Sequence, residues 1–132
     1  VGSDGLLVHN AYNAPSRVLG RALAGAEKAA AAMRKAGNAA AHIIPFKGWS
    51  GATQRGIATR KLHGMAKRFG VDLNSADNGF WSPSRNHGGT HTGDFLEWLV
   101  EELKPARNKS QFLNRLGRTK QRLINGETPW LP

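Results

Sequence analysis

Two short apolar segments, each closed by a proline, most constrain how this chain can fold. Residues 39–45 contain two isoleucines before Pro45, and residues 78–83 place an aromatic pair between Asn78-Gly79 and Pro83. Short runs rich in β-branched or aromatic residues that end at proline are typical of short strands. The Asn-Gly dipeptide favours a tight turn with positive φ values. We therefore expect two short strands that pair as a ribbon.

Helical periodicity dominates much of the remaining chain. Apolar residues recur at helical spacing in residues 15–37, in residues 53–69, from Thr90 or Thr92 to Pro105, and within residues 106–126, where Ser110 is a favourable N-cap near the start. Residues 1–14 have no clear period and are expected to form an irregular arm. The predicted fold class is α+β, with a short two-stranded ribbon and a following helix braced by several additional helices.

Composition narrows the class of protein further. A chain of 132 residues with 39% hydrophobic content is expected to form one domain, residues 1–132, around a single core. Its formal charge of +10 attracts polyanions, so nucleic acid is the leading partner, although an acidic protein or an anionic membrane surface would suit the same charge. No apolar run approaches the roughly 20 residues that a membrane span needs, so no membrane role is expected. Without cysteine, any metal must be held by nitrogen and oxygen ligands.

Three histidines are placed where they suggest chemistry. His42 lies in the first predicted strand, and His87 and His91 flank a Gly-Gly pair just before the third predicted helix. Histidines four residues apart share one side of a helix and can bind one metal ion, but a loop followed by a helix start fits this spacing equally well. Phosphodiester hydrolysis needs an activated water, a group that takes its proton, and positive charge near the leaving oxygen. A neutral imidazole and one divalent metal ion together supply all three. Taken alone, His42 also fits a buried core histidine, and His63, inside the second predicted helix, is expected to be structural.

At these residues the chain resembles the HNH/endonuclease VII superfamily of ββα-metal nucleases, most closely its AHH branch, found as C-terminal toxin domains of bacterial polymorphic toxins. That branch has Ala-His-His with Ile-x-Pro, then Asn-Gly-x-x-x-Pro, then His-Thr before an aromatic-bearing helix. The chain shows His42-Ile43-Ile44-Pro45, Asn78-Gly79-Phe80-Trp81-Ser82-Pro83 and Thr90-His91-Thr92. The match covers about residues 39–100, which are the expected ββα-metal core.

The resemblance implies a role for each matching residue. His42 would be the general base, His91 a metal ligand and His87 a second possible ligand. Asn78 would orient His42 or tie the ribbon together through its amide. Four basic residues flank the proposed cleft in sequence and are candidates for holding phosphates, although each also fits an ordinary solvated cation: Lys47, Arg55, Arg60 and Arg85.

One position departs from the family pattern. Where the branch has the first histidine of its pair, this chain has Ala41, which can neither bind a metal nor accept a proton. By analogy with colicin-type nucleases, Ala41 removes a metal ligand; if the roles within the pair are reversed, it removes the base. We hypothesise that Ala41 is a His-to-Ala substitution that inactivates a toxic nuclease, with a naturally degenerate copy as the alternative. The codon in the native gene would decide between them.

The function implied is that of a metal-dependent endonuclease that cuts DNA without sequence specificity and leaves 5′-phosphates, using one divalent ion among Mg, Mn, Zn and Ni. RNA remains open as a substrate. A toxin domain of this kind would act as a monomer, be secreted or delivered into a target bacterial cell, work in the recipient cytoplasm and meet a cognate acidic immunity protein. Two alternatives are a basic nucleic-acid-binding module without catalysis and an interaction domain in which the histidines are incidental.

Overall fold

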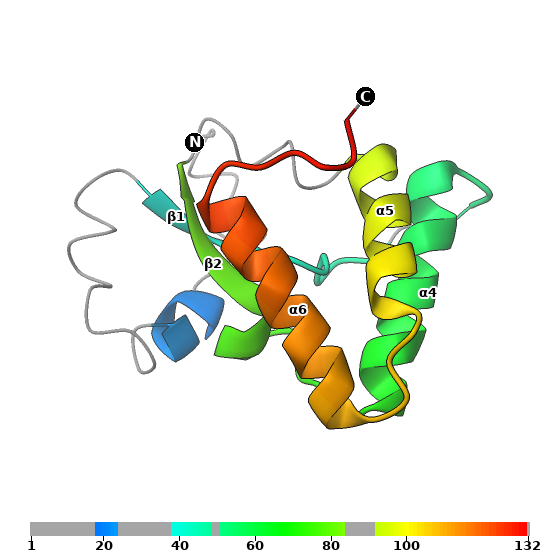
Figure 1. Ribbon diagram of the computed structural model, residues 1–132, viewed down its shortest axis with the longest axis horizontal. Coiled ribbons are helices and arrows are strands. Elements are labelled where there is room, and N and C mark those ends of the chain that lie inside the picture. Colours follow the sequence, from blue (N-terminus) through cyan, green and yellow to red (C-terminus); the bar gives the residue numbers. More distant parts are fainter. Residues whose placement is uncertain (1–17, 24–37, 49–50, 84–91, 132) are drawn as a thin grey trace.

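The computed structural model describes residues 18–23, 38–48, 51–83 and 92–131. Strands β1 (Asn38–His42) and β2 (Gly79–Pro83) form a two-stranded antiparallel sheet (Figure 1). The register pairs His42 with Gly79 at one end and Asn38 with Pro83 at the other. The predicted ribbon is therefore confirmed, although β1 ends at His42 rather than at the proline.

Helices surround the ribbon in an α+β fold, which confirms the predicted class. They are α4 (Gln54–Arg68), the short 3-10 helix η1 (Ala76–Asn78), α5 (Gly93–Leu103) and α6 (Lys109–Ile124). Helix α4 packs along α5, and α6 packs on β2 and η1 (Figure 1). Residues 18–23 are helical, as predicted, whereas the rest of that predicted helix and the arm at residues 1–14 lie outside the described residues.

The ends of α4 and α5 follow from local sequence. The side chains of Thr53 and Thr92 cap the two helices by accepting hydrogen bonds from the backbone N–H three residues on. At the other end of α4, Gly70 has φ +67, in the left-handed region that favours glycine. Its N–H donates to Lys67 O, and Val71 N–H donates to Ala66 O, the paired bonds that close many helices. Both predicted helix starts, with Thr92 rather than Thr90, are confirmed.

Helix α6 starts close to the predicted position, about Ser110, but Ser110 is not its N-cap. Asn108 is the N-cap, and its Oδ1 accepts a hydrogen bond of 2.8 Å from Gln111 N–H. The Gln111 side chain reaches back, and its Oε1 accepts from Arg107 N–H at 2.8 Å. This reciprocal pair satisfies two backbone donors, whereas a serine cap alone would satisfy one, so the helix begins earlier.

The predicted tight turn at Asn78-Gly79 is also wrong. Gly79 has φ −127 and ψ 153, which is ordinary extended backbone, and Asn78 ends η1. Glycine is required there for space instead: a Cβ at position 79 would lie 2.6 Å from Leu19 Cδ1. The two strands are joined through α4 and η1, so they do not form a hairpin.

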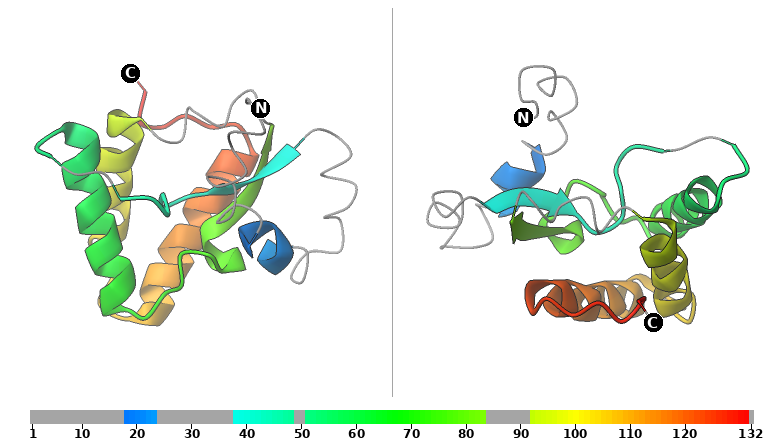
Figure 2. Two further views of the ribbon diagram at one scale, coloured as in Figure 1. Left: turned by 180° about the vertical axis from the view of Figure 1, so that it is seen from behind. Right: turned by 90° about the horizontal axis from the view of Figure 1, so that it is seen from above.

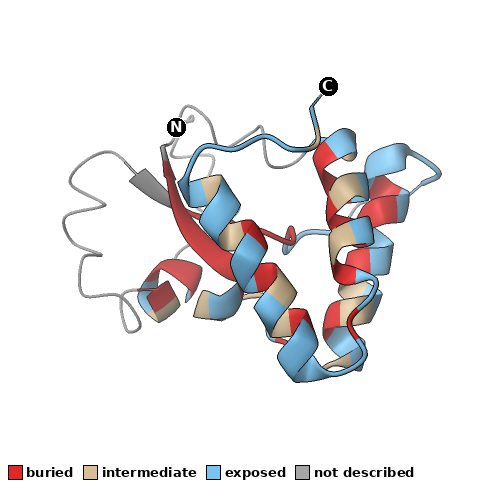
Figure 3. Cartoon of the chain, in the orientation of Figure 1, coloured by how far each residue is buried: buried red, intermediate tan, exposed pale blue. Residues whose placement is uncertain are grey.

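The ribbon separates two apolar clusters. One face of the ribbon packs against residues 18–23, where Leu19 and Leu23 contact Ala40 and Trp81. Its other face belongs to the main core, which it shares with α4, α5 and α6. The right-hand view of Figure 2 shows the strands between residues 18–23 and α6, and Figure 3 shows the buried residues concentrated on the ribbon and the inner faces of the helices. The core residues of α5 and α6 include Phe95, Leu96, Leu99, Leu103, Phe112 and Leu116.

Substitution of Gly79 by alanine should test this close approach. Leu19 is fully buried, so its side chain has little room to yield to a new methyl group. We expect Gly79→Ala to lower the free energy of unfolding by roughly 1–3 kcal/mol in a denaturant titration. The control is Gly64→Ala on α4, where an added Cβ meets nothing within 4 Å and helix propensity should add up to about 1 kcal/mol. Equal effects of the two substitutions would contradict the packing described.

Candidate active site

His42 ends β1 with its imidazole held by a side chain from a distant loop. The residue is only 5% exposed, and its Nε2 lies 2.8 Å from Asn74 Oδ1. An amide oxygen can only accept, so Nε2–H is the donor and the lone pair of the neutral ring is on Nδ1. The Phe46 ring lies beside it, with ring centroids 5.9 Å apart. The geometry fixes both the tautomer and the orientation of the imidazole.

The surroundings of His42 also keep it neutral. Burial lowers its pKa from the ordinary value of 6.5, because the charged imidazolium loses solvation, and the hydrogen bond to Asn74 offsets part of this effect. The ring is therefore uncharged at pH 7 and has a lone pair ready to accept a proton. A neutral, oriented imidazole has the properties of a general base.

Asn74 is held in place by the loop that carries it. Its backbone N–H donates to Asp72 Oδ1 at 2.8 Å, and both the N–H and the Oγ–H of Ser75 donate to Asp72 O. Such Asx turns are a common use of aspartate in loops. Asn74 is not among the site residues predicted from the sequence: the Asp-Leu-Asn-Ser stretch indicates a turn, but no local signal shows that the Asn74 amide reaches a residue 32 positions earlier.

Asn78 ties the end of β1 to the same loop. The fully buried Asn78 amide accepts from Ile44 N–H at 2.8 Å, and its Nδ2 donates to Ile44 O and Leu73 O at 2.9 Å each. The Asn78 backbone carbonyl also accepts from Ile43 N–H. The amide thus joins the chain on either side of the site, while the His42 ring is bound by Asn74 rather than by Asn78.

Replacing Asn78 by alanine is expected to destabilise the fold strongly. The substitution leaves two buried backbone groups of Ile44 and the carbonyl of Leu73 without the amide, at a cost of roughly 2–4 kcal/mol. Chemical denaturation would measure the loss. The control is the exposed Asn114, whose side chain makes no hydrogen bond within the described part of the chain; Asn114→Ala should change stability by less than about 0.5 kcal/mol. A small effect at Asn78 would contradict its role as a tie.

Ala41 faces away from His42. Adjacent strand residues point to opposite faces, and Ala41, fully buried, lies in the main core with Ile43 and Phe80. An imidazole at position 41 would begin inside that core. To act beside His42 it would need a local bulge or twist in β1.

The basic residues near the site lie on the turn after β1 and on α4. Lys47 and Arg55 are exposed, and Arg60 Nη2 donates to Gly51 O at 2.8 Å, so Arg60 also supports a loop. His63 is partly buried, and its Nε2 donates to Pro45 O at 2.6 Å. His63 therefore anchors the turn after β1 to α4, which agrees with the structural role expected for it. Phosphate binding by the three cations stays a prediction.

The candidate metal ligands cannot be placed. His87, His91 and Arg85 lie outside the described residues. Within residues 18–23, 38–48, 51–83 and 92–131, no group of three or more His, Asp or Glu side chains is arranged to hold a metal ion. The described residues alone therefore do not fit a metal centre, and a metal site at this ribbon would depend on the two histidines of the segment before α5.

In the same described ranges, no helix is long and apolar enough to cross a membrane.

Comparison with known proteins gives one match. A sequence model of a nuclease family of the HNH/ENDO VII superfamily with conserved AHH matches residues 23–123, which include the ribbon, both asparagines of the site and α4 to α6. No curated protein and no solved structure matches the chain. The match spans most of the sequence. The chain belongs to the AHH nuclease family of the HNH/endonuclease VII superfamily.

Proposed function

We propose that this member of the AHH family is an endonuclease that hydrolyses DNA phosphodiester bonds with His42 as the general base. The observation that supports this most is the 2.8 Å bond between His42 Nε2 and Asn74 Oδ1, which leaves Nδ1 as the basic nitrogen of a neutral ring. Nδ1 would take a proton from a water molecule as the water oxygen attacks phosphorus. The bond from phosphorus to the 3′ oxygen then breaks, so the product carries a 5′-phosphate.

The substrate must reach a nearly enclosed imidazole. With 5% of His42 exposed, the scissile phosphate has to approach to within one water molecule of the ring. Side chains that cover the ring must then give way as the substrate binds. The charge of +10 would draw a polyanion toward this surface, with Lys47 and Arg55 as exposed candidates for phosphate contacts.

The proposed cleavage uses one divalent metal ion as a cofactor, because nucleases of this superfamily are generally metal-dependent. Its proposed ligands are His87 and His91. The test is calorimetric titration of the chain with Mn²⁺ or Zn²⁺, beside a His87→Ala/His91→Ala variant. Binding that is lost in the variant would support these ligands, and unchanged binding would contradict them.

The biological role proposed is that of a toxin domain delivered into a target bacterial cell. The family resemblance supports it, and the cationic surface suits an acidic immunity protein as the inhibitor. We further propose that Ala41 lowers the activity of this chain, because the family description names a conserved AHH and the corresponding segment is Ala40-Ala41-His42. A binding module without catalysis is the alternative if no variant cleaves nucleic acid.

The pH dependence of cleavage tests the role of His42 and Asn74. Since burial lowers the pKa of His42 below its ordinary value of 6.5, the cleavage rate should rise with pH through that lowered pKa and level off above it. Asn74→Asp places a carboxylate against Nε2–H, which favours the imidazolium and moves the midpoint to higher pH. The control is Asn125→Asp at the end of α6, which adds the same charge away from His42. If the midpoint of the pH profile is the same in the Asn74→Asp variant, the assignment of His42 as the general base oriented by Asn74 is contradicted.

A further inference from the structure

A polar hollow lies where the chain turns from α5 into α6, on elements that contribute nothing to the His42 site. Its volume is about 360 Å³, and it is lined by Pro105, Arg107, Gln111, Asn114, Arg115 and Arg118. Three guanidinium groups and two side-chain amides thus surround one shallow space. No carboxylate is among the lining residues.

Two of the lining side chains are held in place by hydrogen bonds. Arg115 Nη1 donates to Glu102 O at 2.9 Å, which fixes its guanidinium across the end of α5 and leaves its other N–H donors available. Gln111 Oε1 accepts from Arg107 N–H, so the turn that carries Arg107 is tied to the first turn of α6. The Arg115 guanidinium and the Gln111 amide are therefore oriented before any ligand arrives, which reduces the entropy cost of binding through these two groups.

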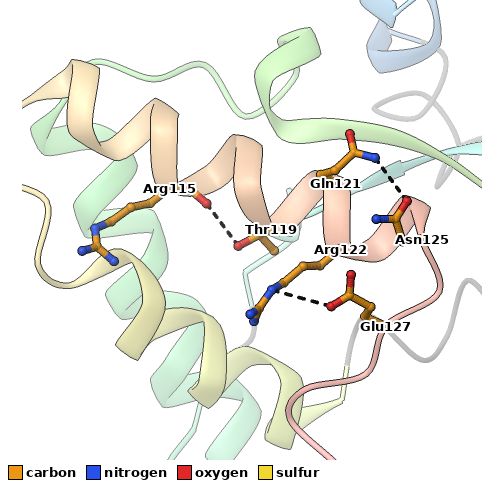
Figure 4. Close-up of polar contacts among 6 residues, drawn as sticks. All are labelled: Arg115, Thr119, Gln121, Arg122, Asn125 and Glu127. Atoms are coloured by element: carbon orange, nitrogen blue, oxygen red, sulfur yellow. Dashed lines mark hydrogen bonds and ion pairs between the residues drawn. The ribbon is translucent and has the colours of Figure 1, made fainter.

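Among residues 18–23, 38–48, 51–83 and 92–131, no carboxylate pairs with the exposed arginines of the hollow. Elsewhere on these helices cations have acidic partners: Lys104 lies 3.8 Å from Glu101, and Arg122 lies 3.9 Å from Glu127. Figure 4 shows Arg115 and Arg122 along α6, with Arg122 bound to Glu127. Among the described residues, neither Arg107 nor Arg118 has a carboxylate within ion-pair distance. The hollow therefore concentrates positive potential.

We propose that this hollow is a second nucleic-acid contact that binds backbone phosphates of the substrate strand away from the cleavage site. The guanidinium fork matches the geometry of phosphate oxygens, and amide side chains donate to the same groups. A protein partner is a poorer fit because protein interfaces have an apolar centre, and Pro105 is the only apolar residue of the lining. The proposal deepens the proposed function and rests on it, since it names how the domain would hold a nucleic-acid strand.

The test is DNA binding without cleavage. Fluorescence anisotropy of a labelled duplex, in chelator and between 50 and 200 mM salt, would compare the wild-type chain with an Arg107→Gln/Arg118→Gln variant. Both arginines are exposed, so thermal unfolding should be unchanged. The matched control is Lys61→Gln/Lys67→Gln on exposed positions of α4, which removes the same charge.

This experiment distinguishes a failure of the proposed phosphate site in the hollow from a failure of the proposed nuclease function. We expect the arginine variant to bind about tenfold more weakly at the lowest salt, with a slope of log affinity against log salt that is smaller by about 2, and the lysine control to lose distinctly less. If wild type binds and both variants lose affinity equally, only overall charge matters and the proposal is overturned. Unchanged DNA binding by the arginine variant also overturns the proposal, and would indicate that the hollow binds a protein partner instead. If the wild-type chain does not bind the DNA duplex at any salt concentration, the proposed function as a DNA endonuclease itself fails.

Discussion

Replacing His42 by alanine is expected to reduce phosphodiester cleavage by about 10²- to 10⁴-fold, the usual contribution of a general base. The reason is specific to the geometry: the ring that Asn74 orients is neutral at pH 7 and is the only imidazole found on the ribbon within the described residues. The rate should be measured by plasmid nicking in the more active of two backgrounds, with Ala41 or with histidine at that position. Circular dichroism would show that the variant is folded.

The matched control for His42 is another partly buried histidine. His63 donates to Pro45 O and so makes a comparable single hydrogen bond from α4. His63→Ala should lower stability by about 1 kcal/mol while leaving the cleavage rate within a few-fold. The assignment would be contradicted by a His42→Ala protein that cuts DNA at the parental rate, or by equal losses for the two histidines.

Substitution of Ala41 by histidine is expected to change activity and stability in opposite directions. If Ala41 replaces a histidine needed for catalysis, cleavage should increase by at least about 10²-fold, the usual range for a lost catalytic group. Because the Ala41 side chain is fully buried in the main core, the added ring must displace core side chains or distort β1, at a cost of roughly 1–3 kcal/mol of stability. Functional groups commonly lower stability in this way.

A buried alanine away from the ribbon separates these two effects. Ala66 on α4 is 2% exposed and belongs to the same core. Ala66→His should destabilise the fold to a similar extent in a denaturant titration without raising cleavage. A rise in activity in both variants, or no rise with histidine at position 41, would contradict the proposal that Ala41 disables the site.

Local sequence signals were sufficient for much of the fold. The threonine caps of α4 and α5 and the glycine that ends α4 act through hydrogen bonds to neighbouring residues, so their effect is visible in a short window of sequence. The two proline-closed apolar runs likewise indicated strands. The motif order placed His42 and Asn78 at one site, and the structure brings both to the same end of the ribbon.

The remaining features depend on contacts between distant segments. The bond of His42 to Asn74 and the need for glycine opposite Leu19 arise only once the ribbon has packed against residues 72–75 and 18–23. Asn-Gly by itself predicts a tight turn, which is its usual local role, whereas here the Asn78 amide joins two segments and Gly79 makes room for Leu19. The orientation of Ala41 toward the main core likewise follows from which face of β1 the helices cover.

Catalysis by His42 is tested most directly by nicking of supercoiled plasmid with four proteins: this chain and its Ala41→His variant, each with and without His42→Ala. Each would be assayed with Mg²⁺, Mn²⁺ or Zn²⁺ and with a chelator. Cleavage should rise with histidine at position 41, disappear on chelation and be lost with His42→Ala. Cleavage that persists without His42, or no cleavage of DNA or RNA by any of the four with any metal, would contradict catalysis by His42.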